Sequence, residues 1–112
     1  MTITELAISV CLTFNNLPCD TIGVRTDKSL RTTELARTTI FTNKRIEILV
    51  QPHISKTKNT HLTRAVLVHE FSHVQLWLSG DINNIHGPKF RRLCTQQAKI
   101  LGVSMRRLCF SY

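Results

Sequence analysis

A long hydrophobic run is missing from this sequence. No segment approaches the roughly 18 uninterrupted apolar residues that a membrane-spanning helix needs. The first residues include Glu5 and lack a basic leader ahead of an apolar stretch, which argues against a signal peptide. We therefore expect an intracellular protein, cytoplasmic or nuclear, with no membrane partner.

Close cysteine pairs of the Cys-x-x-Cys kind, which build zinc ribbons, are also missing. The four cysteines lie far apart in the chain, at Cys11, Cys19, Cys94 and Cys109. Although they could pair, we interpret them as reduced thiols that serve mostly as small core residues of an intracellular protein.

Acidic residues are scarce. The 112 residues include 15 Lys and Arg but only 7 Asp and Glu, so the formal charge is +8. Such an excess favours polyanionic partners, nucleic acid before an anionic membrane surface. A charge that only keeps the protein soluble is the alternative. The length fits a single domain over residues 1–112, with a tail from about residue 103, and we expect a monomer.

The chain begins with an amphipathic segment. Apolar residues recur at helical spacing between Ile3 and Leu17, which indicates a helix with one buried face. Thr2 and Glu5 match a capping box at its start, and Asn15-Asn16 is a stop signal at its end. This helix is predicted to cover one side of the core.

Residues 21–52 have a different character, because β-branched residues are frequent and the apolar period shortens towards two. Asn43-Lys44 is typical of a tight turn between two paired strands, so it predicts a hairpin. The predicted strands cover residues 21–26, 36–41 and 45–50.

Two more helices are predicted in the second half. The first runs from Asn59 or Thr60 to about Ser79 and is apolar on almost every side, which indicates a buried central helix. The second begins near Pro88, a residue that suits the first helical position. The fold class is therefore α+β, with about three helices packed on a small three-stranded sheet.

The central helix contains a His-Glu-x-x-His motif. Residues four apart lie on one face of a helix, so His69 and His73 present their imidazoles side by side, as binding of one zinc ion requires. Glu70 follows the first histidine and can reach a water on that metal as a general base. A pair of ordinary helix histidines beside a surface carboxylate is the alternative.

A catalytic zinc site usually needs a third protein ligand. No glutamate follows Glu70 in the chain, which excludes the arrangement with a downstream glutamate ligand. The residues that remain are His86, Asp81, Cys94 and Cys109. Asp81 resembles a turn residue and Cys94 falls on the packing face of the last helix, so we favour His86, in the loop before that helix.

Together these segments resemble the SprT-like metalloprotease domain, over roughly residues 1–104. The residues that carry the resemblance are Arg37-Thr38-Thr39, the run Leu67-Val68-His69-Glu70-Phe71-Ser72-His73, then His86-Gly87-Pro88-Lys89-Phe90, and Leu101-Gly102-Val103. The resemblance implies a compact zincin-like fold of helices packed with a small sheet. It also implies that His69, His73 and His86 bind one catalytic zinc ion and that Glu70 is the catalytic base.

The SprT-like family includes a protease that removes proteins crosslinked to DNA. We therefore expect a protein substrate on or near DNA, single-stranded or duplex. Basic residues that follow the motif could hold the phosphate backbone close to the metal, although a solvated helix face would look the same. These residues are Lys89, Arg91, Arg92, Lys99, Arg106 and Arg107.

The function that we expect is zinc-dependent endopeptidase activity. Glu70 would take a proton from water and pass it to the leaving amine, while the substrate adds as a strand beside residues 45–50. The main alternative is a nucleic-acid-binding or regulatory protein with a structural zinc, but such a site has no use for a general base. A zinc hydrolase of small molecules is a weaker alternative.

Overall fold

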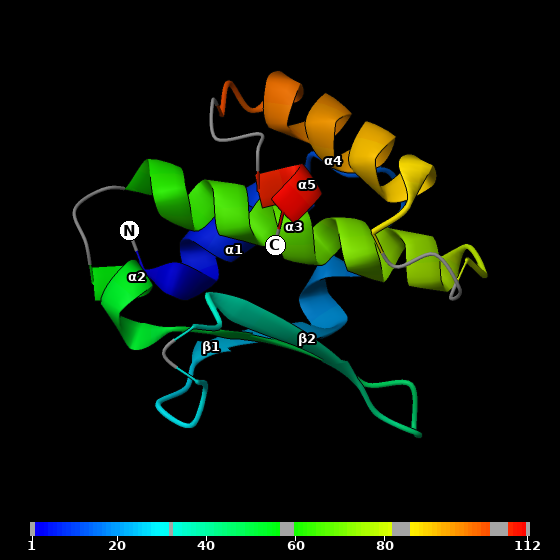
Figure 1. Ribbon diagram of the computed structural model, residues 1–112. Helices are drawn as coiled ribbons and strands as arrows, with labels where there is room; N and C mark the ends of the chain where they lie inside the picture. Colours follow the sequence, from blue (N-terminus) through cyan, green and yellow to red (C-terminus); the bar gives the residue numbers. More distant parts are fainter. Residues whose placement is uncertain (1, 32, 57–59, 82–85, 104–107, 112) are drawn as a thin grey trace.

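A three-stranded sheet lies beneath layered helices (Figure 1). The computed structural model describes residues 2–31, 33–56, 60–81, 86–103 and 108–111. Helix α3 runs across one face of the sheet, α1 lies behind it, and α4 lies on the side of α3 that faces away from the sheet. The predicted α+β class, with three longer helices and a small sheet, is confirmed.

Helix α1 spans Ile3–Cys11, with its buried face formed by every third or fourth residue. Its capping box is confirmed, because the Glu5 amide donates to Thr2 Oγ1 and the Thr2 amide donates to Glu5 Oε1, each at 3.1 Å. The helix ends earlier than predicted. After a turn in which Asn16 adopts a φ of 64°, the chain forms the short 3-10 helix η1, Cys19–Thr21.

The strands are β1 (Ile22–Thr26), β2 (Ala36–Ile40) and β3 (Ile46–Val50), in the order β1-β3-β2. The predicted hairpin between β2 and β3 is confirmed, and Lys44 in its turn has a φ of 67°. Strand β1 pairs with β3 in parallel. Because β3 is paired on both sides, the expectation that a substrate strand adds beside it is wrong.

The remaining helices are α2 (Pro52–Lys56), α3 (Thr60–Leu78), α4 (Pro88–Ile100) and α5 (Leu108–Ser111). Helices α2 and α5 were not predicted, because the sequence there indicated only a polar connection and a tail. Pro88 occupies the first turn of α4, as predicted. In the described part of the chain, none of the helices is long and apolar enough to cross a membrane.

Helix α3 lies at the centre of the core. Its residues from Ala65 to Ser72 are all buried, because the sheet and α1 cover one side of the helix and α4 and α5 cover the other. This explains why the middle of the helix has no polar face, since a segment that is enclosed on all sides needs none. Any polar side chain that α3 carries inward is therefore shielded from bulk water.

The cysteines are paired, so the interpretation as reduced thiols is wrong. Cys11 bonds to Cys19, with Cα atoms 5.9 Å apart, and this disulfide joins the end of α1 to η1. Cys94 bonds to Cys109, with Cα atoms 5.6 Å apart, and joins α4 to α5. Both pairs depend on how the chain folds back after a helix, which the spacing of the cysteines does not reveal.

Candidate metal centre

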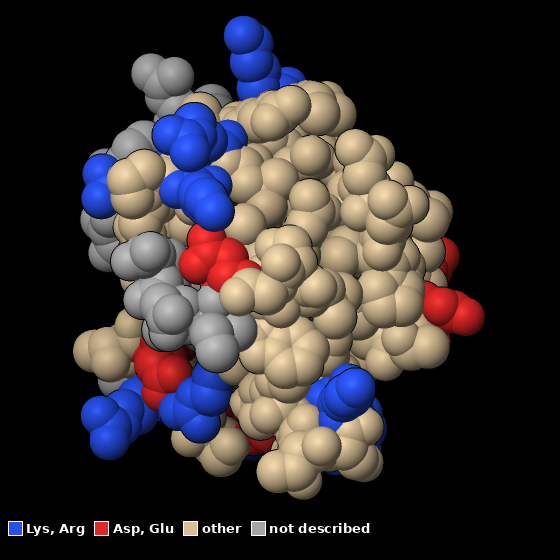
Figure 2. Space-filling view, turned by 90° about the vertical axis from the view of Figure 1, so that its right-hand side faces the viewer, with Lys and Arg blue, Asp and Glu red and all other residues tan. Residues whose placement is uncertain are grey.

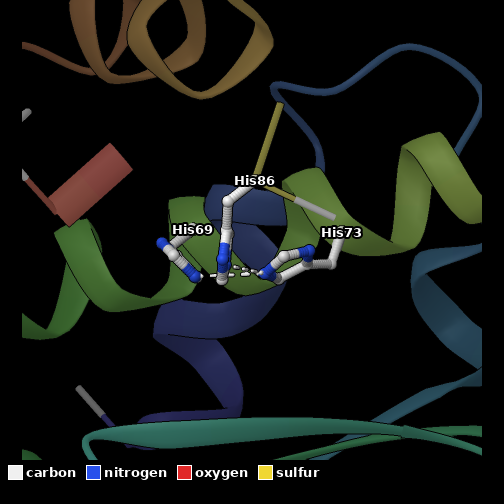
Figure 3. A group of neighbouring side chains, drawn as sticks. All are labelled: His69, His73 and His86. Carbon is white, nitrogen blue, oxygen red and sulfur yellow. Dashed lines mark hydrogen bonds between the residues drawn. The ribbon is translucent and has the colours of Figure 1, made fainter. Parts of the chain in front are cut away.

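The three predicted histidines meet at one point (Figure 3). His69 and His73 project from the same side of α3, and His86 reaches them from the loop before α4. Nε2 of His73 lies 3.1 Å from Nε2 of His69 and 3.2 Å from Nε2 of His86. One ligand atom from each residue lies within 4.8 Å of the others.

This arrangement fits a zinc ion. Tetrahedral zinc with Zn–N bonds of about 2.0–2.1 Å places its nitrogen ligands about 3.3 Å apart. The distances from Nε2 of His73 to Nε2 of His69 and of His86, 3.1 and 3.2 Å, are close to that value. Among the described residues the cluster contains three possible ligands, as in catalytic zinc sites that leave one coordination position for water.

The other candidates for the third ligand are occupied elsewhere. Cys94 and Cys109 form a disulfide and cannot offer a thiolate. A carboxylate oxygen of Asp81 lies 3.7 Å from the ammonium group of Lys89. His86 is the candidate that the fold brings to the pair on α3.

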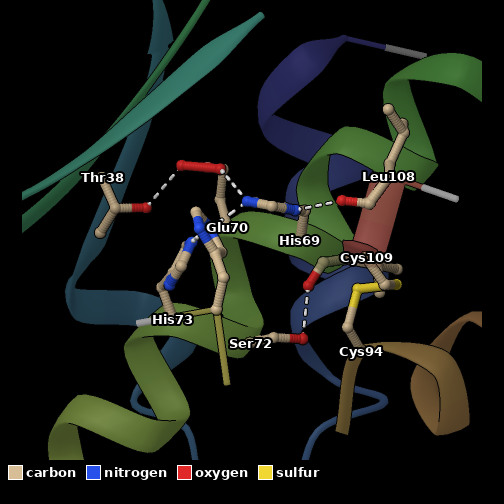
Figure 4. A network of polar contacts seen from close by, with 10 residues as sticks. Thr38, His69, Glu70, Ser72, His73, Cys94, Leu108 and Cys109 are labelled. Atoms are coloured by element: carbon tan, nitrogen blue, oxygen red, sulfur yellow. Dashed lines mark hydrogen bonds and ion pairs between the residues drawn. A yellow bond between two sulfur atoms is a disulfide. The ribbon is translucent and has the colours of Figure 1, made fainter. Parts of the chain in front are cut away.

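The orientation of His69 depends on a residue that the sequence did not indicate. Its Nδ1 lies 2.7 Å from the backbone carbonyl oxygen of Leu108, at the start of α5 (Figure 4). A carbonyl only accepts hydrogen bonds, so Nδ1 carries the proton and Nε2 keeps a lone pair directed at the cluster. No sequence signal could have identified this contact, since any residue offers a backbone carbonyl.

Phe90 forms a wall beside the cluster. Its fully buried ring stacks on His73, with centroids 4.3 Å apart and planes 24° apart. The same ring meets His69 and His86 edge-on, at centroid distances of 4.9 and 5.2 Å. All three imidazoles therefore pack against a single side chain at the N-terminal end of α4.

Burial keeps the imidazoles neutral. Loss of solvent lowers the pKa of His69 from 6.5 to about 3, with a further contribution from His73. Burial and the neighbouring His86 lower the pKa of His73 from 6.5 to about 4, and burial also lowers the pKa of His86. Neutral imidazole is the form that binds a metal, so the site is ready to bind a cation at neutral pH.

The Glu70 carboxylate is buried beside the histidines. Oε1 accepts a hydrogen bond of 3.0 Å from Thr38 Oγ1 on β2, and Oε2 lies 3.8 Å from Nε2 of His69 (Figure 4). Thr38 belongs to a run that carried the family resemblance, but no role was predicted for it from the sequence. Only the packing of α3 on the sheet places its hydroxyl group beside Glu70.

The predicted basic residues divide into two groups. Lys89, Arg91, Arg92 and Lys99 are exposed on α4, whereas Arg106 and Arg107 lie outside the described residues. Figure 2 shows basic side chains near the top of one face, towards α4, and others along its lower edge, while the broad middle of that face carries few charges. Arg91 also has a local role, since its Nε donates to the backbone carbonyl of His86 at 3.2 Å.

Comparison with known proteins gives a family assignment. No curated protein matches the chain in sequence. The family model described as the SprT-like family matches residues 7–108, a range that contains His69, Glu70, His73 and His86. Because that match covers most of the chain, and because the histidines of its motif converge in space, the protein belongs to the SprT-like family.

Proposed function

We propose that this protein is a zinc-dependent endopeptidase that acts on proteins associated with DNA. The observation that carries the proposal is the convergence of three imidazole nitrogens next to the buried carboxylate of Glu70. A structural zinc site would be closed by four ligands and would gain nothing from that carboxylate. Membership of a metalloprotease-like family supports the same reaction class.

The two oxygens of Glu70 have different surroundings, which fits a general base. Thr38 holds Oε1, so Oε2 is the oxygen that lies towards the histidines. A zinc ion bound by the three imidazoles would supply a Lewis acid and a water of lowered pKa. Oε2 of Glu70 takes a proton from the attacking water and then donates it to the nitrogen of the leaving amine.

The substrate strand would add at the edge of β2, which is one of the two outer strands of the described sheet and the one that carries Thr38. The Phe41 amide donates to the Arg45 carbonyl at 2.9 Å. Phe41 and Arg45 are thus a hydrogen-bonded pair, and along an antiparallel ladder such pairs alternate with pairs that are not hydrogen-bonded. Thr38 lies three residues before Phe41 and belongs to a pair that is not hydrogen-bonded, so its backbone N–H and C=O groups face away from β3. A peptide that adds to this edge passes the residue whose side chain holds Glu70.

The preference for DNA-associated proteins is supported by charge. Lys and Arg exceed Asp and Glu, 15 to 7, and α4 carries exposed basic residues directly after the loop of His86. A phosphate backbone held along α4 would bring a protein bound to it towards the metal centre.

The test is cleavage of a DNA-bound protein by purified wild type, Glu70→Gln and His86→Ala, with and without single-stranded DNA. Glu70→Gln keeps the shape of the side chain, so we expect full zinc content with cleavage lowered by at least about a hundredfold. His86→Ala should lose most of its zinc. Equal cleavage by wild type and Glu70→Gln would disprove the mechanism, and full zinc content in His86→Ala would disprove the third ligand.

A further inference from the structure

Helix α5 contributes one backbone atom to the metal centre and is too short to be stable by itself. It has 4 residues, far fewer than an isolated helix needs to be stable in water. Its first residue, Leu108, accepts the hydrogen bond from Nδ1 of His69. The direction in which Nε2 of His69 points therefore depends on whatever holds α5 against α3.

The disulfide between Cys94 and Cys109 is the covalent part of that attachment, beside the packing of α5 on α3 and α4. Cys109 directly follows Leu108 and is 3% exposed, while Cys94 is fully buried on the inner face of α4. One helical turn before Cys94 lies Phe90, whose ring contacts all three histidines. A single crosslink thus joins two supports of His69, the carbonyl of Leu108 and the ring of Phe90.

We propose that the Cys94–Cys109 crosslink sets the zinc affinity of the three-histidine site, by holding the Leu108 carbonyl on Nδ1 of His69. The oxidised chain then retains zinc more tightly than the reduced chain. The cysteines are positioning residues and do not touch the metal. This inference depends on metal binding at the proposed site and not on peptide hydrolysis, so it can be tested even if no protease activity is found.

The chain contains a matched control for this effect. Cys11 and Cys19 form the second disulfide, which joins α1 to η1, and neither element carries a residue of the metal centre. Loss of either crosslink lowers stability, because each disulfide restricts the unfolded chain, and the effect is somewhat smaller for the shorter loop of Cys11–Cys19. Only loss of Cys94–Cys109 should also release the partner of His69.

The first experiment measures zinc affinity by competition with a chelator, for wild type, C94A/C109A and C11A/C19A. Loss of a hydrogen-bond partner of a metal ligand typically weakens metal binding by about 10- to 100-fold. We expect that loss in C94A/C109A and a change of less than about twofold in C11A/C19A. The alanine pair leaves no thiol that could bind zinc in place of the site.

A second readout reports on His69 itself. The Nδ1 proton of His69 is buried and hydrogen-bonded, so a proton–nitrogen NMR spectrum of the metal-free protein should contain its signal. The signal should persist in C11A/C19A and disappear in C94A/C109A. A merely structural role for the crosslink would not single out this proton.

If C94A/C109A does not fold, C11A/C19A provides the same comparison, because Cys94–Cys109 is its only remaining disulfide. This chain is refolded with and without a water-soluble phosphine. The phosphine takes one oxygen from water to become the phosphine oxide, and the disulfide gains two electrons and two protons to give two thiols. The reduced chain should bind zinc at least about tenfold more weakly than the oxidised chain.

Three results would overturn the proposal. One is equal zinc affinity with and without the Cys94–Cys109 crosslink. Another is an equal loss of affinity in both alanine pairs, which would point to general destabilisation. The third is a chain that folds only when oxidised, even in saturating zinc, because the crosslink would then serve the fold as a whole.

Discussion

Each histidine of the metal centre has a contact that restrains it, and the rings of all three pack on Phe90. His69 donates to the carbonyl of Leu108, and His73 is stacked on Phe90. The backbone of His86 accepts a hydrogen bond from Arg91, so the loop that carries this histidine is tied to α4. These contacts restrict the rotation of the histidine side chains before a metal binds. Less side-chain conformational entropy is therefore lost when the metal binds.

Thr38 should position the general base. Replacing it with Val removes the hydroxyl donor and keeps the shape, so the ionised form of Glu70 loses a hydrogen bond. We expect kcat/KM to fall roughly tenfold, the acidic limb of its pH profile to move to higher pH, and zinc content to stay unchanged. These changes are measured by steady-state kinetics across pH, together with metal analysis.

Thr38→Ser is the matched control, since it keeps the hydroxyl group and should restore most of the activity. A Thr38→Val enzyme with the wild-type pH profile would show that the contact with Glu70 has no part in catalysis.

Helix α4 has two faces of different character. Its inner face carries Phe90 and Cys94, both fully buried, and thereby supports the metal centre. Its outer face carries the exposed Arg92 and Lys99, which line a shallow surface groove together with neighbouring side chains of the same helix. A ligand bound to the outer face would thus lie on an element that is directly connected to the histidines.

Charge reversal on the outer face of α4 should weaken DNA binding. Lys89 is unsuitable because Asp81 lies beside it, and Arg91 because it contacts the loop of His86. R92E/K99E avoids both problems. We expect DNA affinity to fall at least about tenfold. The slope of log affinity against log salt concentration should become less steep, by the amount expected for the loss of about two phosphate contacts. Both quantities are measured by fluorescence anisotropy at several salt concentrations.

The control for this variant is K28E/K44E. It changes the net charge by the same amount, but Lys28 and Lys44 are exposed in loops that flank the sheet, away from α4. If both variants weaken DNA binding equally, the net charge of +8 acts as a whole and α4 is not a specific contact surface.

Across the whole molecule, the fold has to enclose ionisable groups before any metal is bound. His69 and Glu70 are 2% and 3% exposed and lie between the helices and the sheet. In the metal-free protein this burial excludes protons from the imidazoles, because loss of solvent disfavours their charged form and neighbouring histidines disfavour it further. The stability of the metal-free fold should therefore depend on pH.

The direction of this dependence follows from the lowered pKa values. The ordinary histidine value is 6.5, whereas the pKa in the folded protein is about 3 for His69 and about 4 for His73. Below pH 6.5 the unfolded chain binds protons that the folded chain excludes, so the free energy of unfolding decreases as pH falls towards the folded values. Urea denaturation of metal-free protein between pH 7.5 and 5.5 should show this decrease.

A double variant separates this effect from other titrations. In H69N/H73N the two imidazoles with the most strongly lowered pKa values are gone, so its stability should vary much less over the same pH range. The carboxylates with lowered pKa values, such as Glu34, titrate below this range and do not interfere. A wild-type stability that is independent of pH between 7.5 and 5.5 would contradict the prediction.

Local patterns predicted a large part of this protein. The spacing of His69 and His73 placed both on one side of a helix, because the helical repeat alone determines that geometry. The capping box of α1, the hairpin turn at Lys44 and the start of α4 at Pro88 depend equally on near neighbours in sequence. The interactions that decide such features span only a few residues, so the sequence alone determined them.

Tertiary structure decided the contacts between distant segments. It placed β3 in the centre of the sheet, paired Cys94 with Cys109, and brought Thr38 to Glu70 and Leu108 to His69. Helical and strand periods show which face of an element is buried but not which element covers it. The partner is set by packing of the whole chain, and for Leu108 by a backbone carbonyl that every residue possesses.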